Sequence, residues 1–460
     1  MGERLLWLAG ALVVLGGCHD FDALRRSGGG GDSAVGDADI VEASVDAPME
    51  AGPPVFDCDA CALGCATDKM HCKYFVPTHW SVAEAEKLGA VPDHEVVFSN
   101  DGGKYYMIIT GESGDKTARV LRFDSERRIA QIPPDTTDFE VDSIPVSIIK
   151  VGGREVAAIV ASKITVEENV VVRATGKRDN RLASRPVAFI ASGDIEVLGT
   201  IDVGSQGLYA AAGADGKAAQ GGASATGSLA NGGAGGGNGT AGGASGVRAG
   251  GGVATDSPPP MARGGAGGNA RDEKGGPIPG GAGGGVFQLV ALGKITIGAS
   301  AVLSAGGGGG TTMPSPVNIT SVVSLAGGGG GGAGGAIFLD APSLRVDGVV
   351  GAPGGGGGSI NCNVYGCSTS SAEDGYAGRT SAAVGGVRGG TCAGGSGSDP
   401  VSGEAGDATN IGCGGGGGAG FVHILTKANG LNDAGATFRP DDRDGPGKLV
   451  ETRDDLEVVE

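Results

Sequence analysis

Three stretches of this chain share one pattern, and that pattern decides the fold. They are Pro186–Gly207 (PVAFIASGDIEVLGTIDVGSQG), Gly285–Gly310 (GVFQLVALGKITIGASAVLSAGGGGG) and Gly335–Gly358 (GAIFLDAPSLRVDGVVGAPGGGGG). Each has an alternating apolar strand, a tight turn, a second alternating strand, and a third short apolar element that ends in glycine. A weaker copy starts at Gly420 (GFVHILTKANG) and a partial one at Ala158 (AIVASKITVEENVVVRATG). Because the order of the parts recurs, the chain contains a degenerate repeat.

This repeat of strands and tight turns without an intervening helix resembles the rungs of a right-handed parallel β-helix. A rung of that fold buries its inner face only by stacking on its neighbour. A sandwich of antiparallel hairpins has the same alternation and is the alternative. We predict an all-β protein in which residues 154–440 form a right-handed parallel β-helix, or solenoid, with glycine-rich insertions.

The spacing of the repeats accounts for the 96 glycines among 460 residues. Equivalent positions Ile195 and Ile295 are 100 residues apart, and Ile295 and Leu344 are 49 apart. A rung needs only about 20 to 25 residues. Because the surplus follows the third element each time, we expect the insertions to leave the solenoid at one corner.

The longest insertion cannot form an apolar core of its own. Residues 204–285 hold seven large apolar side chains, whereas the shorter stretch Val156–Val203 holds 17. Seven are too few to offset a backbone entropy of roughly 1 to 2 kcal/mol per residue. Two hypotheses stay open: a flexible loop, or extended polyglycine helices with three residues per turn, whose backbones approach and hydrogen-bond because they lack Cβ atoms.

The first residues indicate export. Leu5–Leu15 is an apolar run of 11 residues, too short to span a hydrocarbon core of about 30 Å and typical of a secretory signal. The sequence Leu15-Gly16-Gly17-Cys18 resembles the bacterial lipoprotein lipobox. The resemblance implies that residues 1–17 are removed and that Cys18 is lipidated. An ordinary signal peptide with an incidental cysteine is the alternative.

Most of the net charge of −18 belongs to the two ends of the chain. After Cys18, residues up to 57 carry nine acidic and two basic side chains, and residues 441–460 carry eight and three, which together give −12. We predict a disordered acidic tether over residues 18–57 and an acidic tail over 441–460. With 34 basic against 52 acidic residues, the composition argues against a nucleic-acid partner.

Eight further cysteines form two clusters, one near each end of the exported chain. They are Cys58, Cys61, Cys65 and Cys72, and Cys362, Cys367, Cys392 and Cys413. An even number in an oxidising compartment predicts disulfides, and the sequence leaves three connectivities open in each cluster. A zinc site at the first cluster, with His71 and His79 beside it, is the alternative.

Residues 58–153 are expected to form the cysteine-rich start and a small β-rich unit. Within it the sequence predicts a short helix and four strands. These elements are Ser81–Leu88 for the helix, and Glu95–Ser99, Lys104–Thr110, Arg119–Asp124 and Ile144–Val151 for the strands.

We predict no catalytic residues, no cofactor and no metal. Gly237-x-Gly239-x-x-Gly242 fits the dinucleotide fingerprint but lacks the flanking strand and helix that this site needs. Gly394–Ser402 matches a single calcium-binding nonapeptide around Asp399, and a plain turn is preferred because the pattern does not recur. The polar residues in the repeats that a lyase-type enzyme could use are Asp194, Lys294, Asp340, Arg345 and Asp347. Calcium ligation would require their carboxylates to lie within about 5 Å of each other.

In whole-chain pattern the sequence resembles the glycine-rich, PE-PGRS-like predicted surface lipoproteins of environmental Gram-negative bacteria. The resemblance covers the lipobox, the cysteine-rich start and the stretch Lys163–Gly418, whereas the helical Pro-Glu domain of that label is absent. We expect a non-enzymatic cell-envelope lipoprotein, anchored by its N-terminal lipid at the outer membrane or cell surface, with a structural, adhesive or matrix-contact role. Its expected partners are the membrane and extracellular polysaccharide or cell-surface proteins. The alternative is a carbohydrate-active, polysaccharide lyase-like β-helix enzyme.

Overall fold

The structure is a computed structural model of the whole chain. All of the residues that it describes belong to a compact unit spanning Phe56–Glu460, which is distinct from Met1–Val55. The described residues are 63, 73–85, 94–99, 103–109, 118–124, 144, 146–175, 185–207, 222–224, 232–246, 248–252, 261, 264–271, 276–311, 327–363, 366–370, 372–378, 381–385, 394–397, 412–439 and 448–453.

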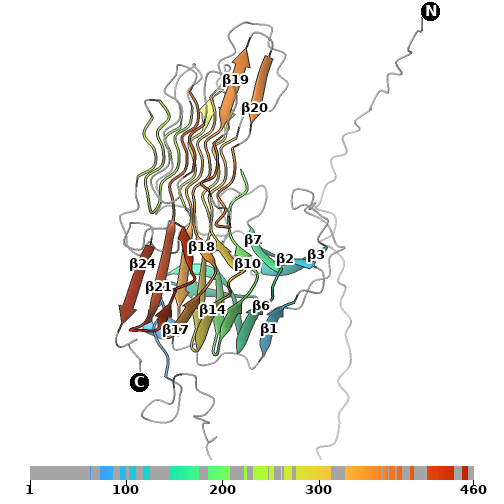
Figure 1. Ribbon diagram of the computed structural model, residues 1–460, viewed down its shortest axis with the longest axis vertical. Helices are drawn as coiled ribbons and strands as arrows, with labels where there is room; N and C mark the ends of the chain where they lie inside the picture. Colours follow the sequence, from blue (N-terminus) through green and yellow to red (C-terminus); the bar gives the residue numbers. More distant parts are fainter. Residues whose placement is uncertain are drawn as a thin grey trace, which may run out of the picture. The chain divides into compact units, whose positions relative to one another are not determined.

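The described part is mostly strands, with a single short helix, α1 (Val82–Ala85), and three large sheets (Figure 1). Sheet 1 has the order β24 (Lys448–Arg453), β21 (Phe421–Lys427), β16 (Ala336–Asp340), β13 (Val286–Ala291), β8 (Val187–Ala191), β5 (Arg154–Ala161), β4 (Ser147–Val151). Sheet 2 has the order β1 (Glu95–Phe98), β6 (Lys163–Val166), β9 (Ile195–Val197), β14 (Lys294–Ile297), β17 (Ser343–Val346), β22 (Leu431–Asn432). Sheet 3 has the order β23 (Thr437–Arg439), β18 (Val349–Gly351), β15 (Val302–Ser304), β10 (Thr200–Asp202), β7 (Val171–Thr175), β2 (Gly103–Ile109), β3 (Ala118–Asp124).

Neighbouring strands in these sheets are parallel, except in the antiparallel pairs β4–β5 and β2–β3. The predicted all-β class is confirmed, and the alternative of an antiparallel sandwich is wrong. Each repeat contributes one strand to each sheet in turn. The five triplets are β5–β6–β7, β8–β9–β10, β13–β14–β15, β16–β17–β18 and β21–β22–β23.

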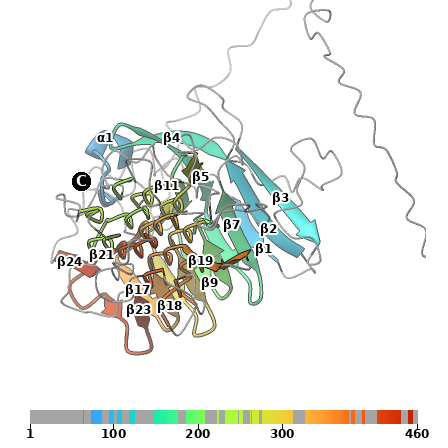
Figure 2. The ribbon, with the colours of Figure 1, turned by 90° about the horizontal axis from the view of Figure 1, so that it is seen from above.

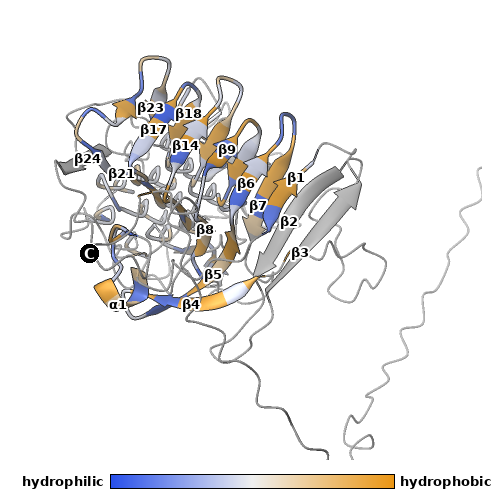
Figure 3. Cartoon of the chain, turned by 90° about the horizontal axis from the view of Figure 1, so that it is seen from below, coloured by the Kyte–Doolittle hydropathy of each residue, from blue (hydrophilic) through white to orange (hydrophobic). Residues whose placement is uncertain are grey.

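Rows of aliphatic side chains hold the three sheets together. In sheet 2, Ile295 is in register with Ile195 on one side and Leu344 on the other. In sheet 1, Leu289 lies between Phe189 and Leu339 in the same way. All six side chains are buried in one cluster that draws on every sheet. Hydrophobic and hydrophilic positions alternate along the strands of sheet 2 (Figure 3), as expected when one face of a strand is buried.

The central strands of sheet 1 (β8, β13 and β16) are buried on both faces, and residues 73–85 cover part of the outer side of the sheet. Phe75, Trp80 and Ala85 pack there against Ile190 and Phe338. The helix α1 occupies half of the range expected from the sequence and begins with a capping box, in which the Ser81 Oγ accepts from the Glu84 N–H while the Glu84 carboxylate accepts from the Ser81 N–H.

A buried polar cluster fixes this cover in place. The carboxylate of Asp340 is 0 % exposed and accepts hydrogen bonds from the Thr78 N–H (3.0 Å), the Thr78 hydroxyl (2.9 Å) and the Gln288 amide (2.6 Å). The Trp80 indole in turn donates to the Gln288 Oε1 at 3.0 Å. These bonds satisfy polar groups that would otherwise be costly to bury.

The strands expected within residues 58–153 are present, and they extend the three sheets instead of forming a sheet of their own. β1 pairs with β6, β2 with β7, and β4 with β5. The expected boundary at residue 153 is therefore crossed by strand pairing in all three sheets. Among the described residues, no helix has the length and apolar character needed to cross a membrane.

The core predicts a large difference between inward and outward truncations. We expect Leu289→Ala, at a fully buried position, to lower the free energy of unfolding by about 2–5 kcal/mol. The control Val97→Ala, on a side chain that is 44 % exposed, should change it by less than about 0.5 kcal/mol. Denaturant titration measures both, and equal effects would contradict the assigned inner face.

Candidate functional site: the glycine lattice and its junction with the sheets

All three glycine-rich insertions leave after a strand of sheet 3 and return into a strand of sheet 1. They connect β10 to β13, β15 to β16, and β18 to β21. Their extended segments run side by side beyond one end of the sheets (Figure 1), and the view from above shows them packed against one another (Figure 2). We call this set of segments the glycine lattice.

Residues 328–333 show how the lattice is bonded, because each of their backbone groups is paired with another segment. Successive N–H groups donate to three different neighbouring segments in turn, so that every third residue donates to the same segment. The donor–acceptor pairs are 328→412 and 331→415, 329→311 and 332→308, and 330→268 and 333→265.

The carbonyl groups of the same six residues accept from three further segments. These bonds are 233→328 and 236→331, 358→329 and 355→332, and 281→330 and 284→333. The twelve hydrogen bonds are 2.7–3.1 Å long, and all of them join different segments. Residues 328–333 are therefore surrounded by six other segments, as expected for three-residue-per-turn helices packed side by side. Of the two hypotheses for the insertions, these residues support packed polyglycine helices.

Glycine is required here by the closeness of neighbouring backbones. A Cβ atom built on Gly331 would overlap the carbonyl oxygen of Gly355, and one on Gly332 would overlap that of Ala282. Both would lie closer than 3.0 Å, a separation that real Cβ atoms do not show. Alanine is present where its methyl group has room, as at the exposed Ala266.

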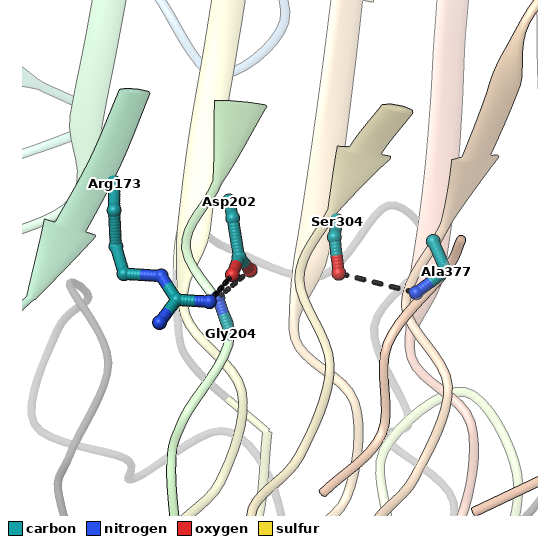
Figure 4. Close-up of polar contacts among 5 residues, drawn as sticks. All are labelled: Arg173, Asp202, Gly204, Ser304 and Ala377. Atoms are coloured by element: carbon teal, nitrogen blue, oxygen red, sulfur yellow. Dashed lines mark hydrogen bonds and ion pairs between the residues drawn. The ribbon is translucent and has the colours of Figure 1, made fainter. Parts of the chain in front are cut away.

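Polar side chains fix the lattice where it meets sheet 3 (Figure 4). Asp202, at the end of β10, is 3 % exposed; it pairs with Arg173 of β7 and accepts from the Gly204 N–H at 2.8 Å. On the next strand, the Ser304 hydroxyl accepts from the Ala377 N–H at 3.3 Å. The sheet thus continues into the lattice through hydrogen bonds on two adjacent strands.

The segment that contains Ala377 adds two further contacts. The Asp374 Oδ1 accepts from the N–H groups of Gly207 and Gly309, both at 2.7 Å, and so joins two glycine segments. Burial raises the pKa of the Tyr376 hydroxyl, as does the charge of Asp202, although a hydrogen bond with Thr200 and the charge of Arg173 oppose the shift.

The structure gives only part of the predicted cysteine sites. Cys18, the whole first cluster and Cys392 lie outside the described residues. Cys413 is buried and disulfide-bonded. Cys362 and Cys367 lie opposite each other in an antiparallel hairpin at the far end of the lattice (Figure 1).

The polar residues that a lyase-type enzyme would use lie on separate elements. The Asp194 Oδ1 accepts from the Lys294 N–H at 2.7 Å, Arg345 pairs with Asp347 at 2.6 Å on an exposed surface, and Asp340 is buried under Thr78. The part of the chain that the structure describes contains no group of three side chains able to hold a metal ion.

The two glycine motifs set aside in the sequence belong to the lattice. The Gly242 N–H donates to the Gly251 carbonyl, and the N–H groups of Gly395 and Gly397 donate to the carbonyls of Gly414 and Ala383. Asp399 itself lies outside the described residues.

Sequence reasoning missed the polar residues of the junction. Asp202, Ser304 and Gly351 occupy equivalent positions at the end of the third strand of their repeats. Arg173 occupies this position in the preceding repeat, and Arg439 occupies it in the last one. The opposite charges of Arg173 and Asp202 at equivalent positions were the available signal for their pairing.

The close packing predicts that one added methyl group is costly inside the lattice and harmless at its surface. We expect Gly331→Ala to destabilise the protein by about 1–3 kcal/mol, the usual cost of overpacking. Ala266→Ser also adds one heavy atom, but at an exposed position, and should change stability by less than about 0.5 kcal/mol. Thermal and denaturant unfolding measure both variants, and an unchanged Gly331→Ala protein would contradict the packed lattice.

The bonding also predicts slow amide hydrogen exchange. We expect the N–H groups of residues 328–333 to exchange roughly a thousandfold or more slowly than those of an unfolded peptide, because each is bonded inside the lattice. The exposed turn at Gly152–Gly153 is the internal reference for fast exchange. Residue-resolved exchange measurements decide this, since rates equal to those of an unfolded peptide would restore the flexible-loop hypothesis.

Comparison of the chain with family models, curated proteins and solved structures finds no match.

Proposed function

We propose that this protein is a non-enzymatic lipoprotein of the cell envelope, with the glycine lattice as a rigid platform for adhesion or matrix contact. The observation that carries the proposal is the bonding of residues 328–333 to six other segments. Such bonding fixes a backbone that has almost no side chains. A stiff support of this kind suits the presentation of surface loops, since binding residues are commonly carried on loops held by a rigid scaffold.

The fold beneath the lattice is proposed to be a right-handed parallel β-helix. Three features support this: the matching strand orders of the three sheets, the triplets that supply one strand to each sheet in turn, and the register of equivalent aliphatic residues between repeats. In such a fold the insertions leave from one corner, because a longer connection between rungs does not disturb the stacking of the inner faces.

The position of one hairpin fits a contact role. The hairpin β19 (Ser359–Asn363) to β20 (Gly366–Ser370) lies at the end of the lattice farthest from the three sheets (Figure 1). A lipid on Cys18, implied by the lipobox resemblance, would hold the chain at the membrane through the acidic residues that follow it. We propose extracellular polysaccharide or cell-surface proteins as the partners at the far end.

The hydrogen bonds of three carboxylates favour a contact role over a catalytic one. Asp202, Asp340 and Asp374 all accept hydrogen bonds from the protein itself. A lyase-type site would need carboxylates and a base that converge on a substrate. These three carboxylates instead connect segments of the fold to each other.

Labelling with radioactive palmitate tests the anchor. We expect the wild-type protein to incorporate label and to fractionate with membranes, and Cys18→Ser to do neither, because the thiol is the proposed acceptor. Protease treatment of intact cells then reports exposure at the cell surface. Equal labelling of Cys18→Ser and wild type would remove the anchoring proposal.

The contact role has its own experiment. Cells that display the wild-type protein are compared with cells that secrete Cys18→Ser and with cells lacking the gene, for retention on surfaces coated with purified extracellular polysaccharide. Retention that requires the anchored form supports the proposal. Equal retention of all three strains argues against a contact role, and depolymerisation of the polysaccharide by the purified protein would favour the enzyme.

A further inference from the structure

The hairpin at the far end of the lattice places two cysteines directly opposite each other. β19 and β20 are antiparallel, and their register pairs Cys362 with Cys367, one position before the last pair, Asn363 with Gly366. Residues that are opposite each other in an antiparallel pair belong to the same face of the hairpin.

This register meets the distance requirement of a disulfide. Opposed residues in antiparallel strands have Cα atoms about 4.5 or 5.5 Å apart, depending on whether the pair is hydrogen-bonded. A disulfide joins residues whose Cα atoms are about 4.4–6.8 Å apart. Both spacings fall in that range, so the register of the hairpin is compatible with a bond between these cysteines.

We propose that Cys362 and Cys367 form a cross-strand disulfide that closes the hairpin. The sequence alone leaves three pairings open for the last four cysteines, and this bond selects one of them. Cys413 is disulfide-bonded, and Cys392 is then the remaining cysteine of the cluster that can pair with it.

The lattice brings the surroundings of Cys392 and Cys413 together. The Gly395 N–H donates to the Gly414 carbonyl at 2.9 Å, so the segments that follow the two cysteines in sequence are neighbours. Cys392 itself lies outside the described residues. The disulfide-bonded Cys413 therefore lies next to a residue that is bonded to the segment following Cys392.

The bond forms by oxidation of two thiols. Cys362 and Cys367 lose two protons and two electrons, and an S–S bond forms between their Sγ atoms. The electrons pass by thiol–disulfide exchange to a disulfide donor of the oxidising compartment, which is reduced to a dithiol. This inference does not depend on the adhesive role proposed above.

Chymotryptic mapping tests the pairing on the full-length protein. Free thiols are first blocked with N-ethylmaleimide while the protein unfolds without reductant, and the digest is examined by mass spectrometry before and after reduction. Cleavage after Leu344, Tyr365 and Tyr376 puts Cys362 in peptide 345–365 and Cys367 in peptide 366–376. Cleavage after Phe421 puts both Cys392 and Cys413 in peptide 377–421.

We expect peptides 345–365 and 366–376 to appear joined before reduction and separate after it, with peptide 377–421 two hydrogens short of its reduced mass. In the control variant Cys362→Ser, the Cys367 peptide should carry the maleimide while peptide 377–421 is unchanged. A link from either hairpin peptide to 377–421, or maleimide on both Cys362 and Cys367 in the wild type, would overturn the proposal.

Discussion

The absence of Cβ atoms at the glycines of the lattice is the constraint on which the packing of the lattice depends. Backbones without side chains approach closely enough for the N–H and C=O groups of residues 328–333 to bond to six neighbouring segments. Hydrogen bonds between backbones thus do the work that apolar side chains do in an ordinary core. A single larger residue, at Gly331 or Gly332 for example, would meet a carbonyl oxygen of a neighbouring segment.

The sheets and the lattice are stabilised in different ways and need each other at their junction. Between the sheets, rows of aliphatic residues such as Ile195, Ile295 and Leu344 lose their contact with water. The lattice buries few large apolar side chains. The loss of backbone conformational entropy on folding is therefore offset there mainly by hydrogen bonds and close packing. The ion pair between the buried Asp202 and the partly buried Arg173 lies at the junction between the sheets and the lattice. The lattice thereby starts from strands whose positions are already fixed.

Much of the fold could be predicted from the sequence, because the repeat blocks carry their own period and order. The strands around Phe189, Phe287 and Ile337 lie where the alternation put them, and the insertions leave where the repeat spacing put them. Contacts between distant segments could not be predicted, since nothing near Asp340 in sequence indicates that Thr78 will cover it. The composition likewise could not distinguish packed polyglycine helices from flexible glycine loops, because only the spatial arrangement of the segments distinguishes them.

Because the hydrogen-bond partners recur every three residues, the position of each residue within a glycine run determines which neighbouring segment it bonds to. A deletion of one residue within 328–333 would turn every following N–H group of the run by a third of a turn, toward a different neighbour. A deletion of three residues would shorten the segment and keep each group facing its former partner. We therefore expect these runs to tolerate a change in length best in steps of three residues, because of their helical geometry.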